Sequence, residues 1–273
     1  MNALPAIFVS HGSPMLALDG GRTAAAWRKL AAELPAPRAV LIISAHWETA
    51  APSVSAAPAP ETIHDFGGFP QPLYQIQYPA RGAPWLADRV RDLLREANLP
   101  ATIDTTRGLD HGAWVPLREM FPAADVPVAQ LSLQPALGTM HHYRLGRALA
   151  PLRDEGVLIV GSGSLTHNLR DMIPGVTEGS PRVHGYVPAF QEWMHERIVR
   201  HDVAALADYR RGAPDAARAH PDDEHLLPLY VVLGAAGAQA VPRRVHAGIT
   251  EGALAMDAYV FETDRGGRTQ MRQ

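Results

Sequence analysis

Histidine is the residue type in this sequence that is best able to do chemistry. The chain has 13 histidines and no cysteine, so any metal must bind nitrogen and oxygen, and an imidazole is the natural acid or base near neutral pH. Neutral imidazoles from separate loops suit a borderline divalent ion such as Fe(II) or Zn(II), whereas Mg²⁺ and Ca²⁺ prefer oxygen ligands. The positions of the histidines therefore indicate which chemistry is open to the chain.

Three histidines have surroundings that fit a metal ligand. His11 lies in the string Ser-His-Gly-Ser-Pro, where glycine permits close backbone approach and proline fixes the exit of a turn. His46 comes straight off an expected buried strand, where a polar ring needs a partner. His225 follows acidic residues that open an expected helix. Each also has an ordinary explanation, as a surface loop residue, a satisfied core histidine and part of an acid-capped helix respectively.

Five further residues extend this group. His167 could be a fourth ligand or an acid/base beside the metal, and the sequence leaves both roles open. Glu224 or Asp223 could replace one imidazole, because two histidines and one carboxylate are the usual ligands for Fe(II) oxygen chemistry. His64 and His111 each adjoin an aspartate and glycines in an expected loop, where either could shuttle protons.

Aromatic residues near these histidines could form a substrate pocket, although isolated aromatic residues belong more often to the core. The candidates for this wall are Phe66, Phe69, Tyr74 and Trp114. The remaining histidines are expected to be solvated helix residues, including His141, His142, His184 and His195.

Three short apolar runs predict buried strands that end at the candidate histidines. The runs cover residues 6–9, 39–44 and 156–161, and Gly, Ser or Pro follows the first and the last of them. His11, His46 and His167 come after these three runs. Because ligands of open α/β sheets bind at the carboxyl ends of the strands, we expect the three histidines to share that edge.

Helical and extended segments alternate along the rest of the chain and predict an α/β fold. No repeat or low-complexity linker divides the sequence, so one catalytic domain over residues 1–273 is expected, with the Pro- and Gly-rich loop 50–82 as a functional lid or wall. Helices are expected at residues 22–34, 83–97, 142–153, 184–209 and 224–236. Further strands are expected at residues 101–104, 126–133, 243–247 and 253–261.

Composition argues against several classes of function. The formal net charge is -3 and no basic stripe is present, so nucleic acid is not an expected partner. No apolar run approaches the roughly 20 residues that span a bilayer, and residues 1–10 do not look like a signal peptide. The sequence therefore predicts a cytoplasmic protein without a membrane partner. Nucleotide-binding loops and a serine nucleophile elbow are also absent.

The histidine strings, taken in order, resemble the LigB-like class III extradiol ring-cleavage dioxygenases, in particular their DOPA 4,5-dioxygenase branch. The matching strings cover residues 10–229, nearly the whole chain. They are His11-Gly12-Ser13-Pro14, Ser44-Ala45-His46-Trp47, Thr62-Ile63-His64-Asp65-Phe66-Gly67-Gly68-Phe69-Pro70, Leu109-Asp110-His111-Gly112, Thr166-His167-Asn168 and Glu224-His225-Leu226-Leu227-Pro228-Leu229.

This resemblance implies a single three-layer α/β/α domain with a mostly parallel central sheet. It also implies one divalent metal per chain, held by His11, His46 and His225, with His167 as a fourth ligand or the acid/base. Members of the branch are often described as zinc proteins, but Zn(II) has no redox chemistry. We therefore expect Fe(II) in the active enzyme and Zn(II) as a metal found bound.

The implied reaction opens the ring of a small, DOPA-like catechol with O₂ to a muconic semialdehyde. A histidine would remove a phenolic proton, and His167 or His111 would supply a proton to the leaving oxygen. Two alternatives keep the same scaffold. The first is a zinc hydrolase with an activated water, and the second is a non-catalytic binding protein, since fold does not dictate function.

Overall fold

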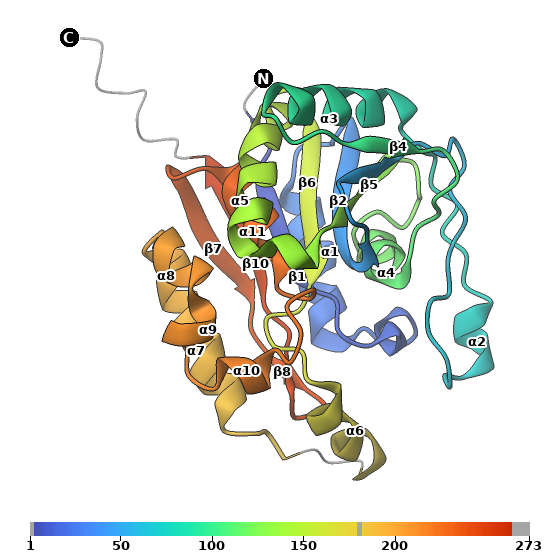
Figure 1. The fold of residues 1–273 in the computed structure, drawn as a ribbon. Coiled ribbons are helices and arrows are strands. Elements are labelled where there is room, and N and C mark those ends of the chain that lie inside the picture. The colour runs from blue at the N-terminus through green and yellow to red at the C-terminus, as the bar shows by residue number, and fades with distance from the viewer. Residues whose placement is uncertain (1–2, 179–181, 264–273) are drawn as a thin grey trace.

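A mostly parallel sheet forms the centre of the computed structural model, which describes residues 3–178 and 182–263 (Figure 1). The strand order in this sheet is β4-β3-β5-β2-β6-β1-β10-β7, and β8 and β9 form a small separate pair. The strands are β1 (Ala6–Ser10), β2 (Ala39–Glu48), β3 (Ser53–Ser55), β4 (Thr102–Asp104), β5 (Val128–Leu133), β6 (Val157–Gly163), β7 (Ala240–His246), β8 (Ile249–Thr250), β9 (Leu254–Ala255) and β10 (Ala258–Thr263).

The four central strands run parallel and are buried on both faces. β2 pairs with β5 and β6, and β6 pairs with β1, all in parallel. The strands next to them are antiparallel, with β10 on β1, β7 on β10, and β3 on β5. Every residue of β1, β5 and β6 is buried, which explains why β1 and β6 begin as apolar runs in the sequence.

Helices cover both faces of the sheet and complete a three-layer α/β/α arrangement (Figure 1). One apolar cluster joins the sheet to α3, α5, α7 and α11, and a second joins its other face to α1 and α4. The helices are α1 (Gly21–Glu33), α2 (Gln71–Tyr74), α3 (Pro84–Glu96), α4 (His111–Met120), α5 (Gly138–Leu149), α6 (Leu169–Glu178), α7 (Tyr186–Val199), α8 (Val203–Ala207), α9 (Tyr209–Gly212), α10 (Ala216–Ala219) and α11 (Leu227–Ala236), with 3₁₀ turns at Pro14–Ala17, Pro135–Leu137 and Ala150–Arg153.

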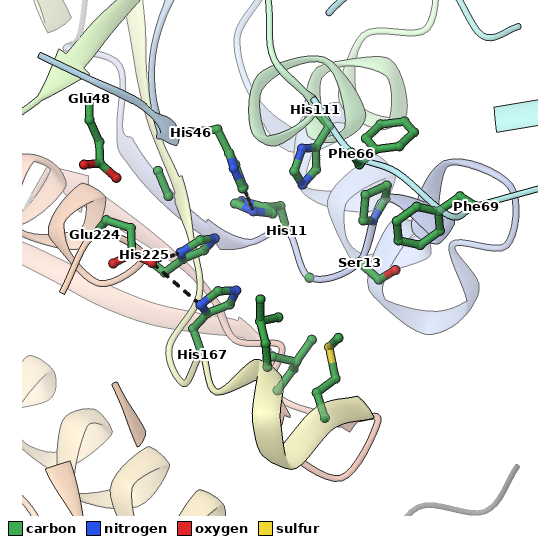
Figure 2. Close-up of a pocket in the computed structure, with 16 residues that line it drawn as sticks. His11, Ser13, His46, Glu48, Phe66, Phe69, His111, His167, Glu224 and His225 are labelled. Atoms are coloured by element: carbon green, nitrogen blue, oxygen red, sulfur yellow. Dashed lines mark hydrogen bonds and ion pairs between the residues drawn. The ribbon is translucent and has the colours of Figure 1, made fainter. Parts of the chain in front are cut away.

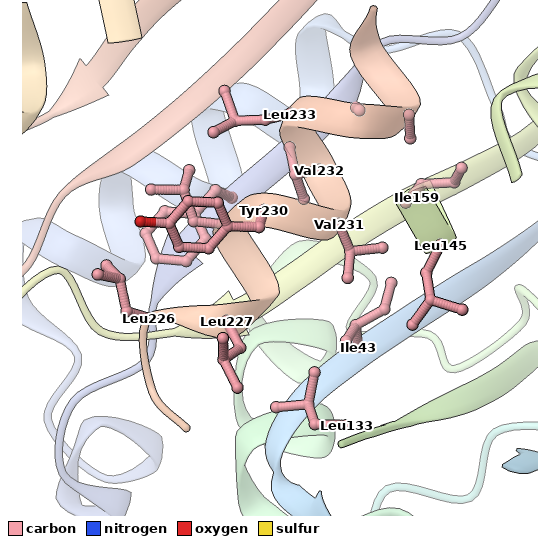
Figure 3. Packing of buried hydrophobic residues seen from close by; sticks show 14 of the residues in the cluster. Ile43, Leu133, Leu145, Ile159, Leu226, Leu227, Tyr230, Val231, Val232 and Leu233 are labelled. Atoms are coloured by element: carbon pink, nitrogen blue, oxygen red, sulfur yellow. The ribbon is translucent and has the colours of Figure 1, made fainter. Parts of the chain in front are cut away.

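Helix α11 is the most deeply buried of the long helices that the structure describes. Its residues Leu227 to Ala235 are all buried, and Tyr230, Val231 and Val232 pack among Ile43, Leu145 and Ile159 (Figure 3). A helix that is apolar on all sides must be enclosed by protein. This burial holds the loop before α11, which carries His225, firmly against the sheet.

Two helix predictions need correction. The helix expected at 184–209 is broken into α7, α8 and the start of α9, because His201 has a left-handed φ of 53° and Asp202 caps a new helix by accepting from the Ala205 N–H. The helix expected from residue 224 begins at Leu227, which leaves His225 in the preceding turn.

Two histidines lie in secondary-structure elements that differ from the prediction. His46 lies within the last residues of β2, not after it. His111 was expected in a loop but is the first residue of α4, whose N-cap Asp110 accepts from the Ala113 N–H. The interior Pro116 obscured this helix in the sequence.

Among the described residues, no helix combines the length and the apolar character that crossing a membrane requires.

Candidate active site

Five imidazoles gather where the parallel strands end, and they line one cavity of about 570 Å³ (Figure 2). They belong to His11, His46, His111, His167 and His225. Strands β2, β6 and β1 are neighbours in the sheet and run parallel, so their carboxyl ends meet at one edge. His46 comes from the end of β2 and His11 follows β1, as the sequence predicted for that edge.

The three histidines predicted as ligands are close neighbours. Ring centroids are 5.0 Å apart for His11 and His46, 5.4 Å for His11 and His225, and 4.9 Å for His46 and His225. The Nε2 atoms of His11 and His46 lie 3.0 Å apart. An ion placed about 2.0–2.1 Å from each nitrogen would fit that separation, so the pair is spaced as two ligands of one metal would be.

Each of these rings turns its other nitrogen toward an oxygen. His11 Nδ1 hydrogen-bonds Ser162 Oγ at 3.0 Å, and His225 Nδ1 donates to Glu224 Oε1 at 2.8 Å. His46 Nδ1 lies 3.5 Å from Asp65 Oδ2. Metal-binding histidines usually present one nitrogen to the ion while the other is held by an oxygen partner. The donor set therefore fits a divalent ion.

Burial keeps these imidazoles neutral. Loss of solvent, followed by the neighbouring imidazoles, lowers the pKa of His11 and of His225 well below its usual value. Burial and then His111 lower the pKa of His46 to about 4. Because only a neutral imidazole has a free lone pair, all three rings can bind a metal at neutral pH without first losing a proton.

His111 is a second candidate for the third ligand position. One nitrogen from each of His11, His46 and His111 lies within 4.8 Å of the others, and the same holds for atoms of His167, Glu224 and His225. The His111 ring centroid is 4.0 Å from that of His46. The described residues thus offer two donor groups around one cavity, and the groups share no residue. The three predicted ligands are divided between them, with His11 and His46 in the first group and His225 in the second.

Asp65 fixes the position of His111. Its Oδ1 accepts from the His111 backbone N–H at 2.8 Å and its Oδ2 lies 3.0 Å from His111 Nδ1. Burial opposes ionisation, but the hydrogen bonds and charge of His111 outweigh it and lower the pKa of Asp65 to about 2. The Asp65 carboxylate therefore stays charged and can hold one orientation of the His111 ring.

His167 stacks directly on His225, with ring centroids 3.4 Å apart and an interplanar angle of 10°. Burial, followed by His220, lowers the pKa of His167 to about 3. Its Nδ1 lies 3.8 Å from Glu224 Oε1, and burial raises the pKa of Glu224. His167 is thus a neutral imidazole at the cavity wall, and its contacts fit both of the roles that the sequence left open.

Two other candidates from the sequence lie outside the histidine cluster. His64 is not among the cavity-lining residues, because its ring hydrogen-bonds the Ile76 carbonyl and packs on Trp114. The Asp223 carboxylate hydrogen-bonds with Arg210 and Tyr209, and not with the histidines. The structure does not bring either residue into the histidine cluster.

The expected aromatic wall is present in part. Phe66 and Phe69 line the cavity, together with Leu169, Met172 and Leu254. Trp114 is fully buried, and neither Trp114 nor Tyr74 is part of the lining. The 50–82 segment does supply a wall, as its composition suggested.

His142 contradicts the expectation of a solvated helix residue. It is fully buried, accepts from the Gln134 N–H and donates to the Gly138 carbonyl. His141 and His195 are half-buried on their helices, whereas His184 precedes α7. Satisfying the polar ring of His142 with backbone partners removes the cost of burying it.

Three site residues escaped sequence reasoning as individual candidates. Ser162 partners His11 from 151 positions away, and Asp65 partners His111 from 46 positions away. Glu48 lines the cavity from the end of β2. Only Asp65 gave a signal in the sequence, because it directly follows His64. A serine inside an apolar strand, such as Ser162, and a glutamate at the end of a strand, such as Glu48, are common in proteins.

We expect Gly163→Ala to loosen the His225 loop. A Cβ at Gly163 would lie 2.0 Å from the His225 carbonyl oxygen, so the loop must move. Overpacking of this kind costs about 1–3 kcal/mol and would weaken metal binding. Thermal unfolding and a metal titration would measure both effects. Gly185→Ala is the control, because its Cβ would meet no atom within 4 Å; equal behaviour of the two variants would contradict the expectation.

Comparison with known proteins places this site in a family. Residues 5–259 match the family model described as the catalytic LigB subunit of aromatic ring-opening dioxygenase. A Beta vulgaris protein named "4,5-DOPA dioxygenase extradiol" is 43% identical over 265 residues, which cover 95% of this chain and 97% of the relative. An Escherichia coli K12 protein of the same name is 40% identical over 260 residues, with 93% of each chain covered.

A solved structure shows the same fold. The crystal structure of an uncharacterized Escherichia coli K12 protein has a TM-score of 0.79 and 35% sequence identity, and the match covers 94% of this chain and 99% of the other. The family model spans every histidine of the cluster, from His11 to His225. This chain therefore belongs to the LigB family of aromatic ring-opening dioxygenases.

Proposed function

We propose that this chain is an extradiol dioxygenase, which opens the ring of a small DOPA-like catechol with O₂ to a muconic semialdehyde. The observation that carries the proposal is the convergence of His11, His46 and His225 in a cavity with an aromatic wall. The names of the relatives support a catechol with an amino-acid side chain as substrate. We further propose that residues 1–273 form one catalytic domain and that the protein acts in the cytoplasm.

The metal centre that we propose holds one divalent ion per chain on His11, His46 and His225. The neutral rings support this ligand set, and so do the hydrogen bonds from the Nδ1 atoms of His11 and His225 to oxygen partners. His46 Nδ1 lies 3.5 Å from a carboxylate oxygen of Asp65. When bound, Fe(II) would supply the redox chemistry that ring opening needs, whereas Zn(II) could occupy the site without it. Fe(II) is therefore the metal of the active enzyme in this proposal, and Zn(II) is a metal that can be found bound.

The protein's own residues orient the substrate and move protons. Phe66 and Phe69 can pack against the flat ring of a catechol and exclude water from one side. His167, as a neutral imidazole, can accept a phenolic proton and return it later, or it can serve as a fourth ligand. His111, held by Asp65, is the alternative proton carrier. A role for His64 remains a prediction without a contact in the cavity to support it.

Metal replacement tests this function. Protein reconstituted with Fe(II) under anaerobic conditions and then exposed to air should consume one O₂ for each catechol that it converts. The product should be a yellow semialdehyde. Protein loaded with Zn(II) should bind catechol but take up no O₂. Oxygen uptake and the visible spectrum, recorded across a catechol panel, measure both outcomes.

Two results would contradict the proposal. Hydrolysis of ester or amide substrates by the Zn(II) protein, without oxygen uptake by the Fe(II) protein, would favour the zinc hydrolase. Catechol binding without turnover under every metal would favour the non-catalytic binding protein.

A further inference from the structure

The charged side chains that line the cavity are all acidic. Among the described lining residues they are Glu48 and Glu224, and no lysine or arginine is present. Figure 2 shows Glu48 and Glu224 on one side of the imidazoles and Phe66 and Phe69 on the other. A substrate whose ring faces the imidazoles and the aromatic wall can therefore extend a side chain toward the two carboxylates.

A second recess continues the cavity on this acidic side. It has a volume of about 440 Å³ and shares Glu48 and Glu224 with the main cavity. Its lining places four carboxylates against one guanidinium, and the residues are Glu48, Pro135, Arg210, Pro221, Asp222, Asp223 and Glu224. The cation, Arg210, already pairs with Asp223, so its charge is not free to receive a substrate carboxylate.

Glu48 is the carboxylate best placed to meet a ligand. Its side chain is exposed, and the described residues provide neither a hydrogen bond nor an ion pair for it. Glu224, in contrast, already accepts from His225. An ammonium group beside Glu48 would gain a partner, whereas a carboxylate there would meet like charge and find no cation.

We propose that this cavity selects catechols by an ammonium group on a short side chain, which Glu48 recognises. The inference rests on the proposed function, because it assumes that the catechol hydroxyls face the imidazoles. It deepens that function by ranking substrates according to charge. Catechol amines bind best, zwitterionic catechol amino acids bind less well, and catechol carboxylates bind least well.

Affinity measured without turnover provides the test. Calorimetric titration of the Zn(II)-loaded protein with dopamine and with 3-(3,4-dihydroxyphenyl)propionate compares opposite charges on side chains of similar length, and 4-methylcatechol is the uncharged reference. We expect dopamine to bind about tenfold more tightly than the propionate at low salt, with the ratio shrinking at high salt because ions screen the carboxylates.

Charge variants assign the preference to Glu48. We expect Glu48→Gln to lower the dopamine-to-propionate affinity ratio about threefold or more, and Glu48→Lys to reverse the preference. Glu96→Gln is the matched control, since Glu96 is exposed on α3 and the change in net charge is the same. A native protein that binds the two ligands equally, or Glu48 variants that behave like Glu96→Gln, would overturn the inference.

Failure of the inference can be told apart from failure of the proposed function. Oxygen uptake by the Fe(II) protein with 4-methylcatechol tests ring opening without a charged side chain. Its absence, together with no uptake on either charged catechol, would overturn the dioxygenase proposal, while the affinity ratio on the Zn(II) protein would still decide the charge preference.

Discussion

Replacing His46 with alanine is expected to abolish stable metal binding and, with it, ring opening. His46 Nε2 lies 3.0 Å from His11 Nε2 at the centre of the cluster, and its ring is 4.9 Å from that of His225. Even loss of an oxygen partner that orients a ligand typically costs about 10–100-fold in metal affinity, so loss of the ligand itself should cost more than about a hundredfold. Metal content after dialysis and a competition titration measure this loss.

His201→Asn is a suitable control for that experiment. His201 lies between α7 and α8, away from the cavity lining, and its φ of 53° is one that asparagine tolerates. This variant should keep full metal loading. Full loading of His46→Ala would remove His46 from the ligand set. Comparison of His225→Ala with His111→Ala would show which of these two histidines is the third ligand beside His11 and His46, and we expect His225→Ala to lose the ion.

Replacing His167 with alanine is expected to lower kcat by about 10²–10⁴-fold, the usual contribution of a general acid or base. The side chain is a buried neutral imidazole at the cavity wall. Metal content should remain near that of the native protein, because the three proposed ligands, His11, His46 and His225, stay in place. Steady-state kinetics on a catechol, normalised to bound Fe(II), measure the effect.

A second variant separates chemistry from packing at this position. His167 stacks on His225 at 3.4 Å, so alanine removes a support for a ligand as well as a proton carrier. His167→Phe keeps an aromatic ring against His225 but has no nitrogen, and it should show the same loss of kcat with the metal retained. Loss of the metal in both variants would assign His167 as a fourth ligand instead.

Local sequence was enough to predict many of the elements that carry the site. The apolar runs before His11 and His167 correspond to β1 and β6, because strands buried on both faces have a clear signature. The break at His201 and the start of α4 at His111 were missed. Those boundaries depend on one backbone angle and one capping carboxylate, and single-residue effects are weak signals in a sequence.

The histidine positions, the absence of cysteine and the strand endings belong to the sequence itself, and they predicted nitrogen donors at the carboxyl edge of a sheet. Only the tertiary structure decided which rings meet. Side-by-side pairing of β2, β6 and β1 brings together His11 and Ser162, which are 151 positions apart, and packing places Asp65 at His111 and Glu48 at the cavity. Such contacts arise from long-range packing of the whole chain, so no local pattern encodes them.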